Sequence, residues 1–188
     1  MNSRKLPLHF ECPIDNYLLT WVEYLNPFFY LLGFNPNGLT LVSAIFGTIC
    51  CINCYYNYYI LGSILHFIGY FFDCADGNFA RRYNMVTQFG DIFDHVKDIL
   101  VGCLLFVVLI YKNQISYYYY CGFIVLLGIN NLYLGQQEQK TICEKSGILQ
   151  LITFKSNISM KVLRYFGCGT LNLYVSFILF MTGIKNKM

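Results

Sequence analysis

A long stretch without any charged residue constrains the fold of this chain most strongly. Residues 25 to 72 contain no aspartate, glutamate, lysine or arginine, and about 20 helical residues are enough to cross the roughly 30 Å hydrocarbon layer of a membrane. The stretch therefore predicts two membrane-spanning helices, at about residues 38–54 and 60–78. Only 12% of the whole chain is charged, against about 25% in soluble domains. The sequence predicts a single membrane domain over residues 1–188.

Further apolar segments extend the predicted bundle to residue 184. They predict helices at about 90–111, 116–135 and 165–184. Residues 143–163 are a weaker candidate because three lysines interrupt them, so this segment is either a short helix or does not fully cross the membrane. The fold class is an all-α integral membrane protein with a bundle of about six transmembrane helices over residues 38–184. Five and six spans place the carboxyl terminus on opposite sides.

The segment before the bundle has a different pattern. Residues 12–34 mix polar groups, Trp21 and Pro27 with apolar residues, which is typical of an amphipathic helix lying in the membrane interface. No apolar core of a cleaved signal peptide precedes it. In "NPNGLT", residues 35–40, we interpret Asn37 as the N-cap of the first span. Asn37 and Thr40 are either a cap and a helix-start residue or groups at a helix amino terminus that receives phosphate.

Aromatic and basic residues predict the orientation. Tyrosine clusters at residues 55–59 and 117–120 are typical of the headgroup level, and both fall on one side if successive spans alternate in direction. Arg81 and Arg82 fall on the other side, which the excess of positive charge in cytoplasmic loops assigns to the cytosol. The neighbouring aspartates are then expected to face the cytosol.

The charge and the cysteines argue against nucleic-acid binding, a disulfide framework and a zinc site. The net charge of +3 is scattered and does not form the clustered basic face of a nucleic-acid-binding protein. The nine cysteines are odd in number and lie mostly in apolar runs, so we expect no disulfide framework. Cys51 and Cys54 form a C-x-x-C pair, but zinc needs four ligands and no second pair has suitable spacing. We expect no metal or redox role for them.

Residues 71–100 interrupt the apolar pattern with five aspartates. On one helix the residues Asp73, Asp76, Gly77, Ala80 and Arg81 fall within an arc of about 140°. On the next, the residues Gly90, Asp91, Asp94 and Asp98 fall within about 100°. Two acidic faces can therefore meet.

Acids at membrane depth cost several kcal/mol unless they are paired, solvated or bound to cations. Carboxylate oxygens suit Mg²⁺, Mn²⁺ or Ca²⁺, and Mg²⁺ commonly joins one or two carboxylates to substrate phosphates. Gly77 and Gly90 leave room for a nucleotide, and Arg81 offers a planar fork of donors for phosphate. The pattern predicts a site for a divalent metal and a diphosphate.

The spacing of these residues also matches a known signature. The pattern D-x2-D-G-x2-A-R-x8-G-x3-D-x3-D is complete, as Asp73, Asp76, Gly77, Ala80, Arg81, Gly90, Asp94 and Asp98. It resembles the signature of the class I CDP-alcohol phosphatidyltransferases. The resemblance covers the signature, its setting between two predicted spans and the "PNGLT" lead, and nothing beyond residue 135 adds to it.

The resemblance implies a six-helix, phospholipid-synthesising membrane enzyme. Such an enzyme transfers a phospho-alcohol or phosphatidyl group from a CDP-linked donor to the hydroxyl of a lipid or polar alcohol and releases CMP, with Mg²⁺ or Mn²⁺ as cofactor. It further implies a homodimer, and a location in the endoplasmic reticulum in a eukaryotic host.

Roles for single residues also follow from the resemblance. Asp73, Asp76 and Asp94 would bind the metal together with the donor diphosphate. Asp98 would help to hold a second metal or act as the base on the acceptor hydroxyl. The CDP-donor site would be formed by Asn37, Thr40, Gly77, Ala80 and Arg81.

Other residues near the signature carry weaker hypotheses. Asp91 is interpreted as a polar helix-start residue, and Arg82 as either a membrane anchor or a ligand. His95, in "FDH", resembles the choline and ethanolamine phosphotransferases, whereas "RYNMVTQFG" is closer to inositol- or glycerophosphate-transferring relatives. His95 should point about 100° away from Asp94, which favours packing or a headgroup contact. His66 is predicted to face the bundle interior.

Two other functions fit an acidic membrane site. An aspartate-rich membrane prenyltransferase also uses metal and diphosphate, but that group resembles a larger bundle with two aspartate motifs, and this chain has one. A non-catalytic protein could use the same acids only to bind cations. The complete signature favours the transferase.

Overall fold

The computed structural model describes residues 3–140, 153–154 and 158–187. Over these residues the chain is helical and has no strand, so the predicted all-α class is confirmed. The helices are α1 Pro13–Leu31, α2 Pro36–Tyr55, α3 Tyr59–Arg82, α4 Gln88–Lys112, α5 Tyr117–Lys140, α7 Met160–Leu163 and α8 Cys168–Lys185, with a 3-10 turn at Arg164–Phe166. Helices α2 to α5 and α8 match predicted segments. The weaker candidate, 143–163, lies mostly outside the described residues.

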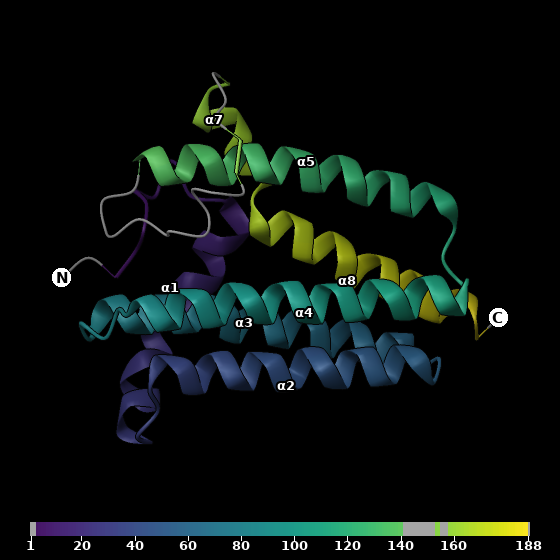
Figure 1. Cartoon of the computed structure of the whole chain (residues 1–188), viewed down its shortest axis with the longest axis horizontal. Helices are drawn as coiled ribbons and strands as arrows, with labels where there is room; N and C mark the ends of the chain where they lie inside the picture. Colours follow the sequence, from purple (N-terminus) through teal and green to yellow (C-terminus); the bar gives the residue numbers. More distant parts are fainter. Residues whose placement is uncertain (1–2, 141–152, 155–157, 188) are drawn as a thin grey trace.

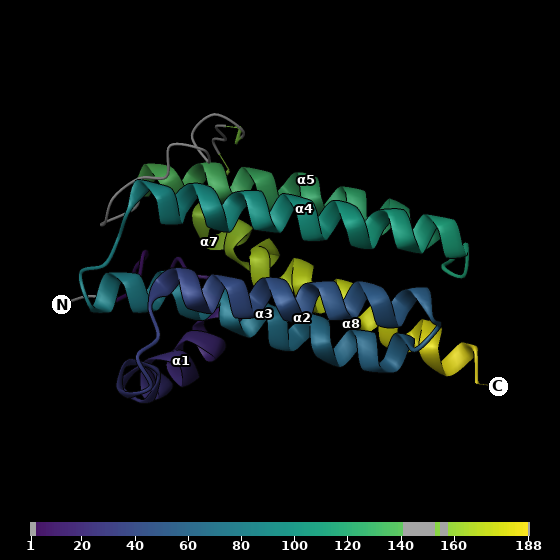
Figure 2. The same ribbon diagram turned by 60° about the horizontal axis from the view of Figure 1, so that its bottom comes forward.

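The long helices form two layers (Figures 1 and 2). Helices α2, α3 and α8 lie in one layer, with α3 packed against both neighbours. Helix α4 packs on α2, and α5 packs on α8, on one side of that layer. Helix α1 crosses the others at a steep angle and packs against α3 on the opposite side. The centre of the bundle is therefore enclosed by α3 and α8 on one side and by α4 and α5 on the other.

The direction of the helices groups the two tyrosine clusters at one end of the molecule. Figure 1 shows that the carboxyl end of α2 and the start of α5, where the tyrosine clusters lie, are at the same end of the molecule. Helix α8 runs in the same direction as α2 and α4, so the carboxyl terminus also lies at this end. This direction favours the five-span alternative. The end that carries Arg81 and Arg82 lies opposite.

Two stretches of the described chain are long and apolar enough to cross a membrane. By length and apolar composition, the stretches Pro36–Tyr55 and Met160–Lys185 could each cross a membrane. Helices α3 and α4 carry the aspartates, and this charge lowers their mean hydropathy. The predicted six spans and the interfacial position of α1 therefore stay predictions.

Two caps fix the start of helices that carry the site. The Asn35 side chain accepts a hydrogen bond of 2.7 Å from Gly38 N, and Pro36 occupies the first position of α2. The prediction that Asn37 is the cap was therefore wrong, because proline prefers the first helical position and leaves the residue before it as the cap. Thr87 caps α4 in the same way, accepting from Gly90 N at 3.0 Å.

Glycines allow the helices of the layer formed by α2, α3 and α8 to approach one another closely. A Cβ atom on Gly183 of α8 would lie 2.8 Å from the backbone nitrogen of Ile60 in α3, and one on Gly62 of α3 would lie 2.8 Å from Cys54 Sγ in α2. Small residues at helix contacts are typical of membrane bundles. Cys54 lies in a buried apolar cluster, and the cysteines in the described part of the chain are all free thiols. The expected lack of a disulfide framework is confirmed for these residues.

Candidate active site

The two acidic faces predicted from the sequence meet where the second half of α3 faces the amino-terminal part of α4. Carboxylate oxygens of Asp73, Asp76 and Asp94 all lie within 4.8 Å of one another. Side-chain atoms of Asp94, His95 and Asp98 form a second such group. The structure thus brings together all four signature aspartates, and Asp94 belongs to both groups.

Asp76 is the most deeply placed of these acids. It is 5% exposed, and its Oδ2 accepts a hydrogen bond of 2.5 Å from the hydroxyl of Thr40 on α2. Thr40 is itself buried. The structure therefore places Thr40 behind the carboxylate, where it orients Asp76 and is shielded from any molecule entering from solvent.

Lys97 lies inside the acidic cluster and was missed in the sequence analysis. Its ammonium pairs with Asp73 and lies 2.7 Å from Asp98 Oδ1 and 3.2 Å from Asp94 Oδ1. A further contact of 3.3 Å reaches the hydroxyl of Ser43. The Lys97 side chain is only 6% exposed. The sequence contained a signal for this position. Lys97 lies one helical turn after Asp94 in an apolar helix, where a lysine needs an acidic partner.

The carboxylate oxygens of the acidic cluster are suited to binding a divalent cation. Asp94 Oδ1 is buried and accepts no well-directed hydrogen bond from the described residues, even though Lys97 Nζ is 3.2 Å away. The four signature carboxylates carry four negative formal charges, and Lys97 supplies one positive charge. Three carboxylates, which offer hard oxygen ligands, in a cluster of net negative formal charge suit Mg²⁺ or Mn²⁺.

The ring of His95 contacts two of the acids of α4. Its Nδ1 is 3.6 Å from Asp94 Oδ2, and its Nε2 is 3.7 Å from Asp91 Oδ1. A helical wheel places His95 about 100° from Asp94, which favoured packing or a headgroup contact, but the imidazole is long enough to reach Asp91, which lies one turn earlier on the same helix, and Asp94. Asp91 itself lies in the first turn of α4, as predicted.

The two arginines are anchored by the amino-terminal segment and α1. Arg81 Nε donates to the carbonyl of Ser3 at 2.8 Å, and its guanidinium lies against Gly77, where a Cβ atom would be 3.3 Å from Nη1. Arg82 Nη1 donates to the carbonyl of Glu23 at 2.6 Å, so Arg82 ties α3 to α1. Gly77 thus leaves room for the Arg81 fork beside the acidic face of α3.

The remaining predicted donor-site residues lie near the same end. A Cβ atom on Gly90 would lie 3.2 Å from Asn37 Oδ1, so the Asn37 amide sits between the starts of α2 and α4. Ala80 is buried on α3 at 9% exposure. Asn37 therefore lies next to the acidic helix, whereas Ala80 belongs to the packed interior.

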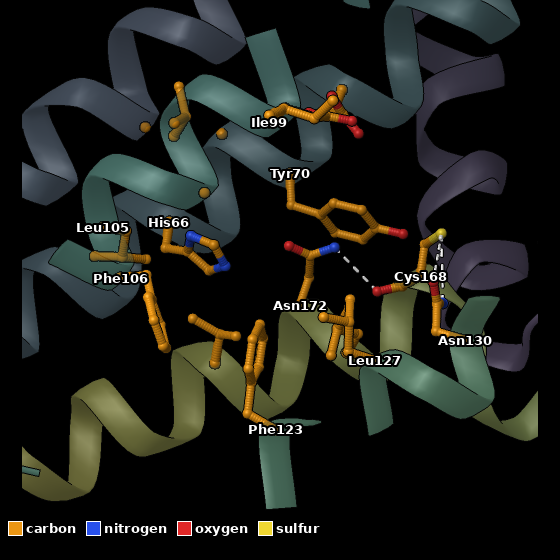
Figure 3. Close-up of a pocket in the computed structure, with 18 of the residues that line it drawn as sticks. His66, Tyr70, Ile99, Leu105, Phe106, Phe123, Leu127, Asn130, Cys168 and Asn172 are labelled. Atoms are coloured by element: carbon orange, nitrogen blue, oxygen red, sulfur yellow. Dashed lines mark hydrogen bonds between the residues drawn. The ribbon is translucent and has the colours of Figure 1, made fainter. Parts of the chain in front are cut away.

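A cavity of about 480 Å³ extends from the acids into the bundle. Asp73, Lys97 and Asp98 line one part of it, and mostly apolar residues of α4, α5 and α8 line the rest. Figure 3 shows His66, Tyr70 and Asn172 in its middle, with Leu105, Phe106 and Phe123 farther along. The predicted interior position of His66 is confirmed. An apolar cavity with charged groups at one part is suited to a ligand that has a polar head and an apolar tail.

Comparison with known proteins gives one family. The sequence model described as "CDP-alcohol phosphatidyltransferase" matches residues 34–183. A CDP-diacylglycerol–glycerol-3-phosphate 3-phosphatidyltransferase of Rickettsia felis is 35% identical over 85 residues, which cover 43% of this chain and 46% of that protein. The Rickettsia typhi protein of the same name is 36% identical over 85 residues, 43% of this chain and 47% of the relative.

A third relative carries a different activity in its name. Human ethanolaminephosphotransferase 1 is 43% identical over 54 residues, 29% of this chain and 13% of that protein. No solved structure matches this chain. The chain thus spans about half the length, or less, of these curated relatives.

Proposed function

The chain belongs to the CDP-alcohol phosphatidyltransferase family, and we propose that it transfers a phosphatidyl or phospho-alcohol group from a CDP-linked donor to a hydroxyl acceptor with release of CMP. Members of this family are membrane proteins that depend on a divalent metal. The observation that carries the proposal is the convergence of all four signature aspartates in two groups that share Asp94. A solvated acidic loop between two spans would not produce this geometry.

Asp73, Asp76 and Asp94 are the proposed metal ligands, with Mg²⁺ or Mn²⁺ as the ion. When bound there, the ion would neutralise charge on the donor diphosphate and on the leaving CMP. Thr40 keeps the Asp76 carboxylate oriented through its 2.5 Å hydrogen bond. Arg81, which lies against Gly77, and Asn37, which lies beside Gly90, are proposed to contact the diphosphate or the nucleotide, with Gly77 and Ala80 shaping the space.

Asp98 is the proposed proton acceptor. Its side chain is 52% exposed, against 21% for Asp73 and 26% for Asp94, so it is more open to an incoming hydroxyl than they are. The Lys97 ammonium, 2.7 Å from Asp98 Oδ1, favours the ionised form that a base requires. Removal of the hydroxyl proton by Asp98 allows direct attack on the donor phosphorus without a covalent intermediate.

The cavity supports a lipid as one substrate. Its apolar part is lined by side chains such as Leu105, Phe106 and Phe123, which could cover an acyl chain while the phosphate lies at the acids. The named relatives differ in the alcohol they handle. We therefore propose only the type of reaction, a transfer from a CDP-linked donor to a hydroxyl group. The assay described next identifies the alcohol.

The proposal predicts strict metal dependence. Purified protein in lipid would be incubated with radiolabelled CDP-diacylglycerol, CDP-choline or CDP-ethanolamine and a panel of acceptors, and the lipid product identified. Excess chelator should abolish turnover and added Mg²⁺ or Mn²⁺ should restore it, because carboxylates alone repel a diphosphate. Full turnover in chelator would overturn the proposed mechanism.

The proposed orientation places the acidic end in the cytosol, at the endoplasmic reticulum in a eukaryotic host. Met85, in the α3–α4 loop, is partly exposed. It suits a cysteine probe better than Asn84, whose backbone has a φ of 56° that favours asparagine. In sealed vesicles, with the exposed Cys103 replaced by serine, a membrane-impermeant maleimide should label Met85→Cys only from the cytosolic side.

The matched control is a cysteine at Tyr118, which is 80% exposed at the tyrosine end. It should react only from the other side. Reversed accessibility of the two probes would contradict the proposed orientation.

A further inference from the structure

His66 is a polar side chain in the middle of the cavity, away from the acids. Its Nε2 atom is buried and makes no well-directed hydrogen bond to any of the described residues. Figure 3 shows the imidazole on one side of the cavity and the side chain of Asn172 on the other. A buried nitrogen without a partner is costly, so a histidine at this place indicates a partner that the described chain does not supply.

The two polar neighbours of His66 in the cavity use their donors elsewhere. The hydroxyl of Tyr70 donates to Asp15 Oδ1 at 2.6 Å. The amide nitrogen of Asn172 donates to the carbonyl of Cys168 at 3.0 Å. Neither donor is therefore available to a molecule in the cavity, whereas the Nε2 atom of His66 is.

The position of His66 on α3 relates it directly to the acids. It precedes Asp73 by seven residues, which is about two helical turns, so the two side chains lie within about 20° of the same face and about 10.5 Å apart along the axis. Both residues line the cavity. A ligand that lies along this face of α3 thus meets charged groups first and the imidazole about 10 Å farther in.

This separation suits a diacylglycerol-based lipid. In a phosphatidyl group, seven bonds join a phosphate oxygen to the nearest ester carbonyl oxygen, which span about 8 Å in extended form at standard bond lengths. A hydrogen bond of about 3 Å from that carbonyl brings the total to about 11 Å. A lipid with its phosphate at the acids therefore places an ester carbonyl near His66.

We propose that His66 Nε2 donates a hydrogen bond to an ester carbonyl of a diacylglycerol-based lipid in the cavity. The inference rests on the proposed function, because it takes the acids as the reacting end of the site. The tautomer that this contact requires carries its proton on Nε2. The same chemistry is present in CDP-diacylglycerol as the donor and in diacylglycerol as the acceptor. In both, His66 selects lipids with ester links over lipids with ether links, which have no carbonyl.

Binding of matched ester and ether lipids tests the proposal. Purified wild-type chain in detergent with Mg²⁺ would bind tritiated CDP-dioleoylglycerol in one arm and tritiated dioleoylglycerol in the other, measured by scintillation proximity. Unlabelled diester and diether forms of the same lipid would compete. We expect the diester to compete about threefold to tenfold better than the diether, which is what one net hydrogen bond contributes.

Variants of His66 assign the preference to this side chain. His66→Phe and His66→Leu remove the N–H donor and differ in size, and each folded variant should bind the diester and the diether equally. His66→Gln keeps an N–H donor and should retain part of the preference. A wild type without a preference, or a folded His66→Phe or His66→Leu that keeps the full preference, would overturn the assignment.

Phe106→Leu is the matched control. Phe106 lines the same cavity and has no polar side-chain atom. The substitution should change the affinity for the diester and the diether by the same factor, so the ratio between them should stay that of the wild type. A ratio that falls to one in Phe106→Leu would attribute the preference to the shape of the cavity and overturn the role of His66.

The two arms separate the sources of the lipid, and transferase assays separate this inference from the proposed function. A preference for the diester with CDP-dioleoylglycerol alone assigns the contact to the donor, and one with dioleoylglycerol alone assigns it to the acceptor. If the preference depends on His66 but no CDP-linked donor reacts, the proposed function fails while the lipid site holds. If the wild type is active and binds both forms equally in both arms, the role of His66 fails while the transferase assignment holds.

Discussion

Asp76→Asn is expected to lower transferase turnover by at least about 10³ and to weaken Mn²⁺ binding with it. Asp76 is 5% exposed and belongs to the group of three carboxylates, with Asp73 and Asp94, whose oxygens lie within 4.8 Å of one another. Asparagine keeps the shape of the side chain but removes the negative charge that a hard cation requires. Losing several kcal/mol of metal-based charge stabilisation corresponds to about a thousandfold in rate, since each 1.36 kcal/mol is tenfold. Initial rates and Mn²⁺ titration measure both effects.

Asp91→Asn is the matched control for this substitution. Asp91 lies in the first turn of α4, outside the signature, and its Oδ1 lies 3.7 Å from His95 Nε2. The control should keep turnover within about threefold, since substitutions outside special environments usually change free energies by about 0.5 kcal/mol or less. An Asp76→Asn enzyme that keeps wild-type turnover and Mn²⁺ affinity would remove Asp76 from the metal site.

The helices and the acidic cluster could be predicted because both depend on local sequence. Apolar runs of spanning length fix where α2 and α8 form, and the fixed spacing of the aspartates fixes their helical face. An aspartate is so costly in an apolar segment that its repeated presence indicates a function. Acids on two neighbouring apolar helices are least costly when they share one cation site, and the two acidic faces do meet in the structure, as predicted.

Lys97 and His95 show what a signature and a helical wheel leave out. A signature treats the positions between its fixed residues as free, so Lys97 carried no weight even though its charge is buried among the acids. A helical wheel follows the direction of the Cα–Cβ bond and ignores side-chain length. The His95 ring can therefore approach Asp91 and Asp94 although its Cβ points elsewhere.

Contacts between distant segments could not be read from the sequence at all. Arg81 is held by the carbonyl of Ser3, 78 residues away, and Arg4 contacts Glu23 at 2.9 Å. Lys5 pairs with Glu138 at 2.5 Å, which connects the amino-terminal segment to α5. The residues in these contacts follow no periodic pattern in the sequence, so only the packing of α1 and the bundle brings them together. Such contacts determine where the Arg81 fork lies relative to the acids.

Asp98→Asn is expected to lower turnover by about 10² or more while weakening binding of the CDP-linked donor far less. Asp98 lies one helical turn beyond Asp94, displaced by about 6 Å along the axis, and it is not part of the group formed by Asp73, Asp76 and Asp94. Asparagine removes the proton acceptor, and general base catalysis contributes about 10² to 10⁴ in rate. A loss confined to turnover indicates an interaction made only in the transition state.

The comparison with Asp76→Asn separates a base from a metal ligand. Calorimetric titration of each variant with Mn²⁺ and with the CDP-linked donor would be run beside initial rates. Asp76→Asn should lose metal and donor binding together, because it removes charge from the group that would hold both. Asp98→Asn should keep its Mn²⁺ affinity, because Lys97 contacts Asp73 and Asp94 in addition to Asp98 and can hold them in place. If Asp98→Asn loses donor binding as severely as Asp76→Asn, Asp98 is mainly a metal ligand, and the hydroxyl proton must leave by another route.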